Sequence, residues 1–253
     1  MLKRELEYFF GAVRFFPRLP APGWVGHSTE ALTSSARYFP AVGLLVGGIG
    51  ALVYVGAALI WPKAVAVLLA MAATLYATGA FHEDGLADTV DGLGGGWDKT
   101  RILEIMKDSR VGSYGVVATV LALLGKFTLL VALDDALLPL ALMAAHAVSR
   151  FAATSLLATM DYARDDDSAK SRPLAGRLSL PALSFAALFA LLPLIFLPLE
   201  NVWPACLLAG LACVWLAGLF RRWLGGYTGD CLGATQQFCE LAFYLGLLAH
   251  WPV

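Results

Sequence analysis

The segment FHEDGLADTVDGLGGG, residues Phe81–Gly96, follows a run of mostly apolar residues and abruptly introduces acids and glycines. In a helix, Asp84, Asp88 and Asp91 stand at positions i, i+4 and i+7 and share one face. Like charges at this spacing repel one another and are strongly disfavoured beside lipid. We therefore expect a cation to neutralise them. The alternative is a solvated acidic loop between two membrane helices.

Mg2+ is the cation that this pattern favours, because it prefers carboxylate oxygen and then collects the phosphates of a substrate. We predict that Asp84, Asp88 and Asp91 are metal ligands in a catalytic site. Glu83 lies about 100° around a helix from Asp84, so it belongs to a second face or binds a second ion. His82 is predicted to act as a base or to orient a carboxylate.

The composition of the whole chain is that of a membrane protein. Of its 253 residues, 59% are hydrophobic and only 15% are charged, and the mean hydropathy is +0.71. A soluble domain is about half apolar and about a quarter charged. The net charge of −1 provides no basic field, so we expect no nucleic-acid partner. The four cysteines lack CxxC or zinc-type spacing and are expected to be reduced apolar residues.

Apolar runs predict an all-α fold, a polytopic membrane bundle of about seven transmembrane helices. Each run is near the ~20 residues that span a bilayer. Residues 1–38 are predicted to be cytoplasmic or interfacial and to begin with an amphipathic helix, which the prolines of Pro17–Trp24 interrupt. A single membrane domain then covers residues 1–253, with the bundle in residues 39–253. The predicted spans are residues 39–61, 64–81, 112–133, 137–159, 182–199, 203–220 and 234–250.

Basic residues predict the orientation of the bundle. If the N-terminus is cytoplasmic, all of the 18 Lys and Arg except Lys63, Lys126 and Arg150 fall in cytoplasmic segments or at span ends there, as the positive-inside rule requires. Three substantial segments then share the cytoplasmic face, namely residues 82–111, 160–181 and 221–233. We predict that these segments form the active site and that it faces the cytoplasm.

Cationic side chains are candidate ligands for substrate phosphates. Arg110 and Arg164 can bind phosphate oxygens bidentately, although loop cations also set topology and attract anionic lipid. Arg150 lies inside an apolar span, where a cation costs about 2.5 kcal/mol or more, and this favours a functional role. Lys126 lies deeper and either binds substrate or extends toward the outer surface. Lys107, Lys170 and Arg172 have the same two interpretations as Arg110 and Arg164: they bind phosphate, or they set topology and attract anionic lipid.

Two further acids are candidates for the site. Asp230, in a Thr-Gly-Asp turn between two spans, either completes the metal coordination or is an ordinary turn residue. Glu240 is a carboxylate within the last predicted span and is expected to face the site. His146, on an apolar helix, is expected to be a packed core residue.

Together these features favour phosphoryl transfer, with a divalent ion bridging a pyrophosphate while the protein positions an attacking alcohol. The sequence has no GxxxxGK[ST] motif, so nucleoside triphosphate hydrolysis is not expected. A transporter is the competing class because intramembrane charges also mark ion pathways, but the polar residues here cluster on one side. A non-enzymatic scaffold leaves the acids and Arg150 unexplained.

Several motifs, in order along nearly the whole chain, resemble those of the cobalamin-5'-phosphate synthases, also called adenosylcobinamide-GDP ribazoletransferases. The most specific is FHEDGLADTVDG at residues 81–92. That family usually has an apolar residue where this chain has Glu83. The other motifs are RLPAP (Arg18–Pro22), EIMKDSRVGSYG (Glu104–Gly115), Lys126, AVSR (Ala147–Arg150), YAR (Tyr162–Arg164) and TGDCLGA (Thr228–Ala234).

The resemblance implies an enzyme of late cobalamin (vitamin B12) biosynthesis in the bacterial inner membrane. Its substrates would be adenosylcobinamide-GDP and α-ribazole or α-ribazole 5'-phosphate, and it would release GMP. Mg2+ held by Asp84, Asp88 and Asp91 would bridge the GDP pyrophosphate while the ribazole 3'-hydroxyl attacks. An aspartate or His82 would take the hydroxyl proton. The substrate-binding residues would be Asp108, Arg110, Lys126, Arg150, Arg164 and Asp230.

The runner-up is a CDP-alcohol phosphotransferase of phospholipid synthesis, which runs parallel chemistry. Its signature resembles DxxDGxxAR, and Asp88–Gly92 reproduces DxxDG, but Gly95 and Gly96 stand where Ala and Arg belong. The expected partners are therefore the two small-molecule substrates and membrane lipid. A homo-oligomer stays open, because small-residue runs such as Gly43–Ala51 pack helices within or between chains.

Overall fold

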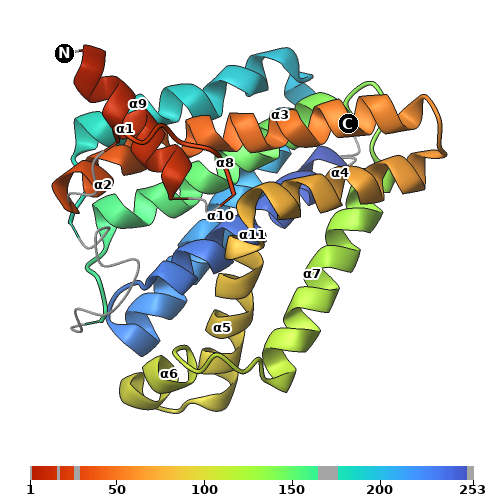
Figure 1. Cartoon of the computed structure of the whole chain (residues 1–253). Helices are drawn as coiled ribbons and strands as arrows, with labels where there is room; N and C mark the ends of the chain where they lie inside the picture. The colour runs from red at the N-terminus through yellow and green to blue at the C-terminus, as the bar shows by residue number, and fades with distance from the viewer. Residues whose placement is uncertain (1, 16–17, 26–28, 165–175, 250–253) are drawn as a thin grey trace.

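The computed structural model describes residues 2–15, 18–25, 29–164 and 176–249, and these residues form helices joined by short connections. Within them the only β pairing is an isolated bridge between Tyr162 and Tyr227, so the predicted all-α class is confirmed. The helices (Figure 1) are α1 (Leu2–Arg14), α2 (Thr29–Ser35), α3 (Phe39–Ala58), α4 (Lys63–Thr78), α5 (Phe81–Gly95), α6 (Lys99–Ile105), α7 (Ser113–Ala132), α8 (Leu138–Thr159), α9 (Leu180–Leu191), α10 (Leu199–Leu224) and α11 (Gly229–Leu247), with 3-10 segments η1 (Ala36–Tyr38) and η3 (Leu192–Phe196).

Fewer helices than predicted are long and apolar enough to cross a membrane. Four qualify among the described residues, namely Leu32–Ala58, α7, α8 and α10, and a fifth if α4 and α5 count as one bent span. The predicted span at 182–199 is instead the 12-residue α9 followed by η3, which has Pro193 in its first turn. The predicted span at 234–250 begins earlier, at Gly229, and buries Gln236, Gln237 and Glu240. A helical membrane bundle is confirmed, with a smaller number of full spans.

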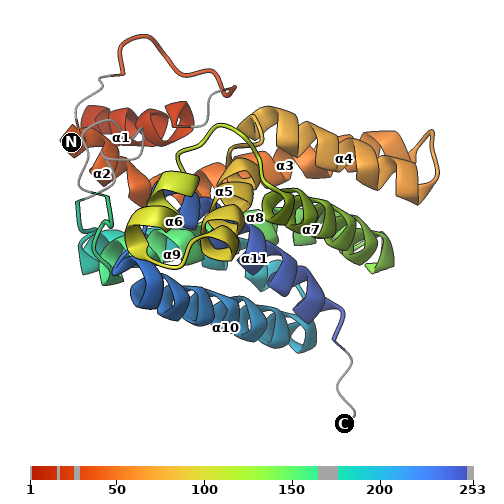
Figure 2. The same cartoon turned by 90° about the horizontal axis from the view of Figure 1, so that it is seen from below.

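A sharp corner separates α4 from α5. Gly79 and Ala80 both adopt left-handed backbone angles, with φ of 66° and 56°, and the axes of the two helices differ by 84°. Because an L-residue rarely adopts positive φ, Ala80 marks a strained joint immediately before the acidic segment. The predicted cytoplasmic segment 82–111 is mostly helix, as α5 and α6 show. Helices α5 and α7 lie side by side, with α6 at their far end (Figures 1 and 2).

The N-terminal helix α1 is amphipathic, as predicted. It buries Tyr8, Ala12 and Val13, while Leu2 and Leu6 of the predicted apolar side stay 75% and 42% exposed. Glu5 fixes the helix to the segment that leads into α3, because its carboxylate accepts hydrogen bonds from Arg37 at 2.6 Å and from the Tyr38 hydroxyl at 2.7 Å. The N-terminal segment is thus joined to the bundle by a specific polar contact.

Glycines of α3 let its backbone touch that of α8. A Cβ on Gly43 would lie 2.3 Å from the carbonyl oxygen of His146, and one on Gly47 would lie 2.6 Å from the Cα of Met143. Both distances are too short for any side chain. The prediction that the run Gly43–Ala51 packs helices is therefore confirmed within the chain, and the homo-oligomer stays a prediction.

Gly47→Ala should destabilise the protein by about 1–3 kcal/mol, since the added methyl group forces two backbones apart. Gly48→Ala, one residue further along, meets no atom within 4 Å and should be neutral or stabilising by up to about 1 kcal/mol through helix propensity. Thermal unfolding of both variants in the same detergent measures the difference. Equal losses in the two variants would contradict the close α3–α8 contact.

Candidate functional site

The site is built where α5 crosses α11. A Cβ on Gly85 would lie 2.9 Å from the carbonyl oxygen of Asp230, and one on Gly233 would lie 3.2 Å from the Cα of Gly85. Only glycine permits two helix backbones to approach so closely. As a result, Asp88 lies near enough to Asp230 and Asp84 for their negative charges to act on it. The tertiary structure thus joins Asp230 to two of the predicted acids of α5.

A third segment reaches the same place through backbone pairing. The amide of Tyr227 donates to the carbonyl of Asp161 at 2.9 Å, and the amide of Ala163 donates to the carbonyl of Tyr227 at 2.8 Å. This pairing places Arg164 beside Asp230, and its Nη2 donates to the carboxylate at 2.7 Å. The three segments predicted to share one face therefore meet here. The Nε of Arg164 is buried and has no hydrogen-bond partner among the described residues.

Asp91 accepts hydrogen bonds from the start of α7. Its two oxygens accept hydrogen bonds from the amides of Gly112 and Gly115, at 2.7 and 2.8 Å. These amides belong to the exposed N-terminal turn of α7, so Asp91 caps that helix and holds it against α5. The side chain is only 7% exposed. In this arrangement both carboxylate oxygens of Asp91 cap a helix, and its predicted role as a metal ligand stays a prediction.

Glu83 makes a contact with α11. Its Oε1 accepts a hydrogen bond from Gln237 Nε2 at 2.9 Å, and its predicted role as a metal ligand stays a prediction. His82 is buried, and it lines a small cavity together with Arg150, Gln236 and Phe39. Its predicted role as a base remains a prediction, and its backbone lies at the α5–α11 crossing, where a Cβ on Gly233 would be 3.3 Å from the His82 Cα.

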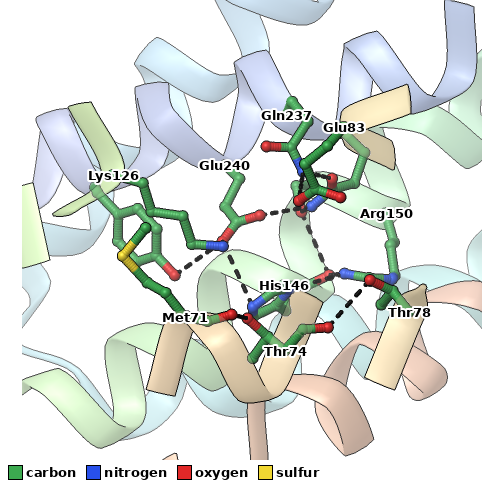
Figure 3. A network of polar contacts seen from close by, with 12 residues as sticks. Met71, Thr74, Thr78, Glu83, Lys126, His146, Arg150, Gln237 and Glu240 are labelled. Atoms are coloured by element: carbon green, nitrogen blue, oxygen red, sulfur yellow. Dashed lines mark hydrogen bonds and ion pairs between the residues drawn. The ribbon is translucent and has the colours of Figure 1, made fainter. Parts of the chain in front are cut away.

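The two intramembrane cations do not extend to a surface. Lys126 and Arg150 are 4% and 2% exposed, and both belong to a buried polar network (Figure 3). Lys126 Nζ lies 2.6 Å from Glu240 Oε1, and Arg150 Nη1 donates to the carbonyl of His146 at 3.1 Å. Both cations are therefore engaged by protein groups, and their binding of substrate phosphate stays a prediction. Outward extension of Lys126 is excluded by this pairing.

Asp108 and Arg110 lie together on the connection between α6 and α7. Arg110 donates from Nε to Asp108 Oδ1 at 3.0 Å and from Nη2 to Oδ2 at 2.7 Å. Hydrogen bonds from the Arg110 side chain and backbone lower the pKa of Asp108 to about 2. The pair borders a hollow of about 430 Å3 that Asp91 and Tyr114 also line. Asp108 therefore orients Arg110 beside the end of the acidic helix.

The donor chemistry at the crossing suits a hard divalent ion, because Asp84, Asp88 and Asp230 provide only oxygen. These side chains do not surround a common point, since no three His, Cys, Asp or Glu side chains in the described part of the chain are placed to hold a metal. Asp230 is instead held by Arg164. The predicted cations Lys170 and Arg172 lie outside the described residues.

Comparison with known proteins identifies the family. The family model described as cobalamin-5-phosphate synthase matches residues 8–248. The chain belongs to the cobalamin-5-phosphate synthase family. Curated relatives named adenosylcobinamide-GDP ribazoletransferase include proteins of Shewanella woodyi, 47% identical over 98% of each chain, and Leptothrix cholodnii, 48% identical over 98% of this chain and 97% of the relative. No solved structure matches the chain.

Membership in this family makes the chain an enzyme, a transferase of cobalamin biosynthesis. The resemblance seen in its motifs is thereby confirmed. The family match does not favour the alternative hypotheses of a CDP-alcohol phosphotransferase, a transporter or a scaffold. The roles of individual residues stay predictions.

Sequence reasoning missed the partners of the intramembrane charges. Gln236 and Gln237 were included in an apolar span, although both are buried and bonded in the network around Glu240. Two adjacent glutamines followed by Glu240 in such a span were the available signal, because buried amides require partners. The glycine contact between α5 and α11 had no comparable signal, since it joins residues far apart in the chain.

Asp91→Ala should destabilise the protein by about 1–2 kcal/mol, because two amides at the start of α7 lose their acceptor. The matched control is Asp98→Ala, which removes the cap of the exposed helix α6, where Asp98 Oδ1 accepts from the Arg101 amide at 2.9 Å. Its loss should be smaller, since water replaces the bond there. Thermal unfolding in detergent measures both. A larger loss for Asp98→Ala would contradict the capping role of Asp91.

Proposed function

We propose that this transferase joins adenosylcobinamide-GDP to α-ribazole or α-ribazole 5'-phosphate, giving adenosylcobalamin or its 5'-phosphate and GMP. The names of the curated relatives support these substrates. The single structural observation that carries the proposal is the crossing of α5 and α11, which brings Asp230, held by Arg164, close enough for its charge and that of Asp84 to act on Asp88. Acids that can hold a metal beside a phosphate-binding arginine are the groups that pyrophosphate chemistry requires.

In this proposal Asp84, Asp88 and Asp230 would hold Mg2+, which would supply positive charge to a bound pyrophosphate. Arg164 already donates to Asp230, and its buried Nε is available to a phosphate oxygen. Arg110, oriented by Asp108, lies in position to bind a further phosphate at the edge of the hollow between α5 and α7. The chain thus binds and orients the pyrophosphate from two sides.

The transfer itself forms one bond and breaks one bond. The ribazole 3'-hydroxyl oxygen attacks the phosphorus attached to the cobinamide arm, and the bond from that phosphorus to GMP breaks. The hydroxyl proton passes to a base. We assign that base to an aspartate of the cluster, because His82 is buried within the cavity that Arg150 and Gln236 line.

Asp84→Asn and Asp230→Asn should each lower turnover by about 100-fold or more, which corresponds to roughly 3 kcal/mol of lost transition-state stabilisation. Asp98→Asn, an exposed aspartate that caps α6, should retain wild-type turnover. The measurement is GMP release from adenosylcobinamide-GDP with each ribazole form, in detergent or liposomes, with Mg2+ and after its removal by chelation. Wild-type protein should lose turnover on chelation.

Three results would contradict the proposal. Turnover that survives complete chelation would remove the metal from the reaction. Release of CMP from a CDP-alcohol, with no GMP from either ribazole form, would indicate a CDP-alcohol phosphotransferase. Full activity of both Asp84→Asn and Asp230→Asn would place the reaction elsewhere in the bundle.

We further propose that the chain lies in the bacterial inner membrane with the acidic cluster facing the cytoplasm. The distribution of basic residues supports this orientation. The two ends of α7 should therefore lie on opposite sides, with exposed Trp97 on the cytoplasmic side and exposed Asp134 outside. An impermeant maleimide should label Asp134→Cys in spheroplasts and Trp97→Cys only after lysis. The reverse pattern would invert the topology.

A further inference from the structure

Glu240 is the centre of a buried network inside the bundle. It is 1% exposed, and its Oε1 lies 2.6 Å from Lys126 Nζ of α7. The same oxygen accepts from the Tyr244 hydroxyl at 3.1 Å, and Oε2 accepts from Gln236 Nε2 at 2.7 Å. His146 of α8 lies 3.5 Å from Oε1. One carboxylate therefore connects α7, α8 and α11 (Figure 3).

The network continues from Glu240 to the acidic helix. Gln236 Nε2 also donates to Ser149 at 3.0 Å, and Gln236 Oε1 accepts from Gln237 Nε2 at 2.7 Å. Gln237 Nε2 in turn donates to Glu83 Oε1 at 2.9 Å. An unbroken series of hydrogen bonds thus runs from Glu240 on α11 to Glu83 on α5. Glu83 immediately precedes Asp84 in the chain.

The burial of these charges calls for an explanation beyond stability. Two acids, Glu83 and Glu240, lie among two cations, Lys126 and Arg150, so the set balances in charge. A buried ion pair is nevertheless weak evidence for stability, because apolar residues of similar size often serve as well. Intramembrane charges are functional by default. The hydrogen bonds that connect these charges reach Glu83, the neighbour of Asp84 in the chain.

Asp91 ties the C-terminal half of the acidic helix to α7, and the N-terminal half needs an anchor of its own to set its rotation. It begins at a corner where Gly79 and Ala80 have positive φ, and its contact with Gly233 is made through Gly85, which has no side chain to resist rotation. Glu83 and Asp84 point about 100° apart around the helix. Fixing Glu83 toward Gln237 therefore fixes the direction in which Asp84 points.

We propose that the series Glu240–Gln236–Gln237–Glu83 is a positioning network that sets the rotation of α5 and so aims Asp84 and Asp88 at the metal. The inference rests on the proposed function, since it presumes that these aspartates hold a divalent ion. It assigns Glu83 a place in the network instead of a place on the metal. Displacement of a ligand by about 1 Å is enough to weaken a site severely.

The test separates the positioning role from simple loss of packing. Gln237→Leu and Glu83→Leu break the series at its last link, and each should weaken Mn2+ binding about tenfold or more, the usual effect of removing a partner that orients a metal ligand. Glu83→Gln keeps an oxygen that accepts from Gln237 and should bind Mn2+ within about twofold of wild type. Mn2+ binding is followed by electron paramagnetic resonance on purified protein, independently of turnover.

The matched control is Thr235→Val. Thr235 is fully buried on α11 and donates to the carbonyl of Cys231 at 2.7 Å, so the variant also loses one buried hydrogen bond, outside the network. It should lower the melting temperature and leave Mn2+ binding within about twofold. Thermal unfolding is measured for all four variants. Weaker binding in Gln237→Leu than in Thr235→Val, at similar stability, supports the proposal.

Three results would overturn it. If Gln237→Leu binds Mn2+ like Thr235→Val, the series does not position the acids. If Glu83→Gln loses Mn2+ as severely as Asp84→Asn, Glu83 is itself a ligand. If wild-type protein binds no Mn2+, the proposed metal site fails and this inference fails with it, whereas unchanged binding in Gln237→Leu overturns the inference alone.

Discussion

The contact between Gly85 and Gly233 is the constraint on which the rest of the site depends. Because neither residue has a side chain, α5 and α11 touch through their backbones, and the acid at the start of α11 comes to lie beside those of α5. The bridge between residues 161–163 and Tyr227 then brings Arg164 to Asp230. Larger residues at either glycine would separate the two helices and, with them, Asp230 from the acids of α5.

The polar side chains of the bundle divide into two sets with opposite character. The inner set around Glu240 is balanced in charge, with buried Lys126, Arg150 and Glu240 and half-buried Glu83. The outer set of Asp84, Asp88 and Asp230 is mainly acidic, with Arg164 as its one cation among the described residues. An unbalanced set beside a balanced one is the arrangement expected where the missing charge comes from a bound cation and its substrate.

The corner at Gly79 and Ala80 links the membrane body to this chemistry. It turns the chain by 84° between α4 and α5, so the acidic helix leaves the direction of the preceding span and lies alongside α7. Asp91 then joins these two helices through the amides of Gly112 and Gly115. In this member of the cobalamin-5-phosphate synthase family, the candidate site therefore lies where the ends of several helices come together.

The sequence by itself determined the all-α membrane class, the family, and the segments that carry the acids, because composition, span length and motif order are local properties of the chain. It also showed that Arg150, Lys126 and Glu240 were unusual within apolar spans. Only the tertiary structure decided that Asp91 caps α7, that Glu83 faces Gln237 and that Asp230 joins Asp84 and Asp88. The physical reason is that a carboxylate's role depends on which donors surround it, and those donors come from helices distant in sequence. The buried glutamines of α11 follow the same rule, since Ser149 of α8 and Glu83 of α5 supply acceptors for their amides.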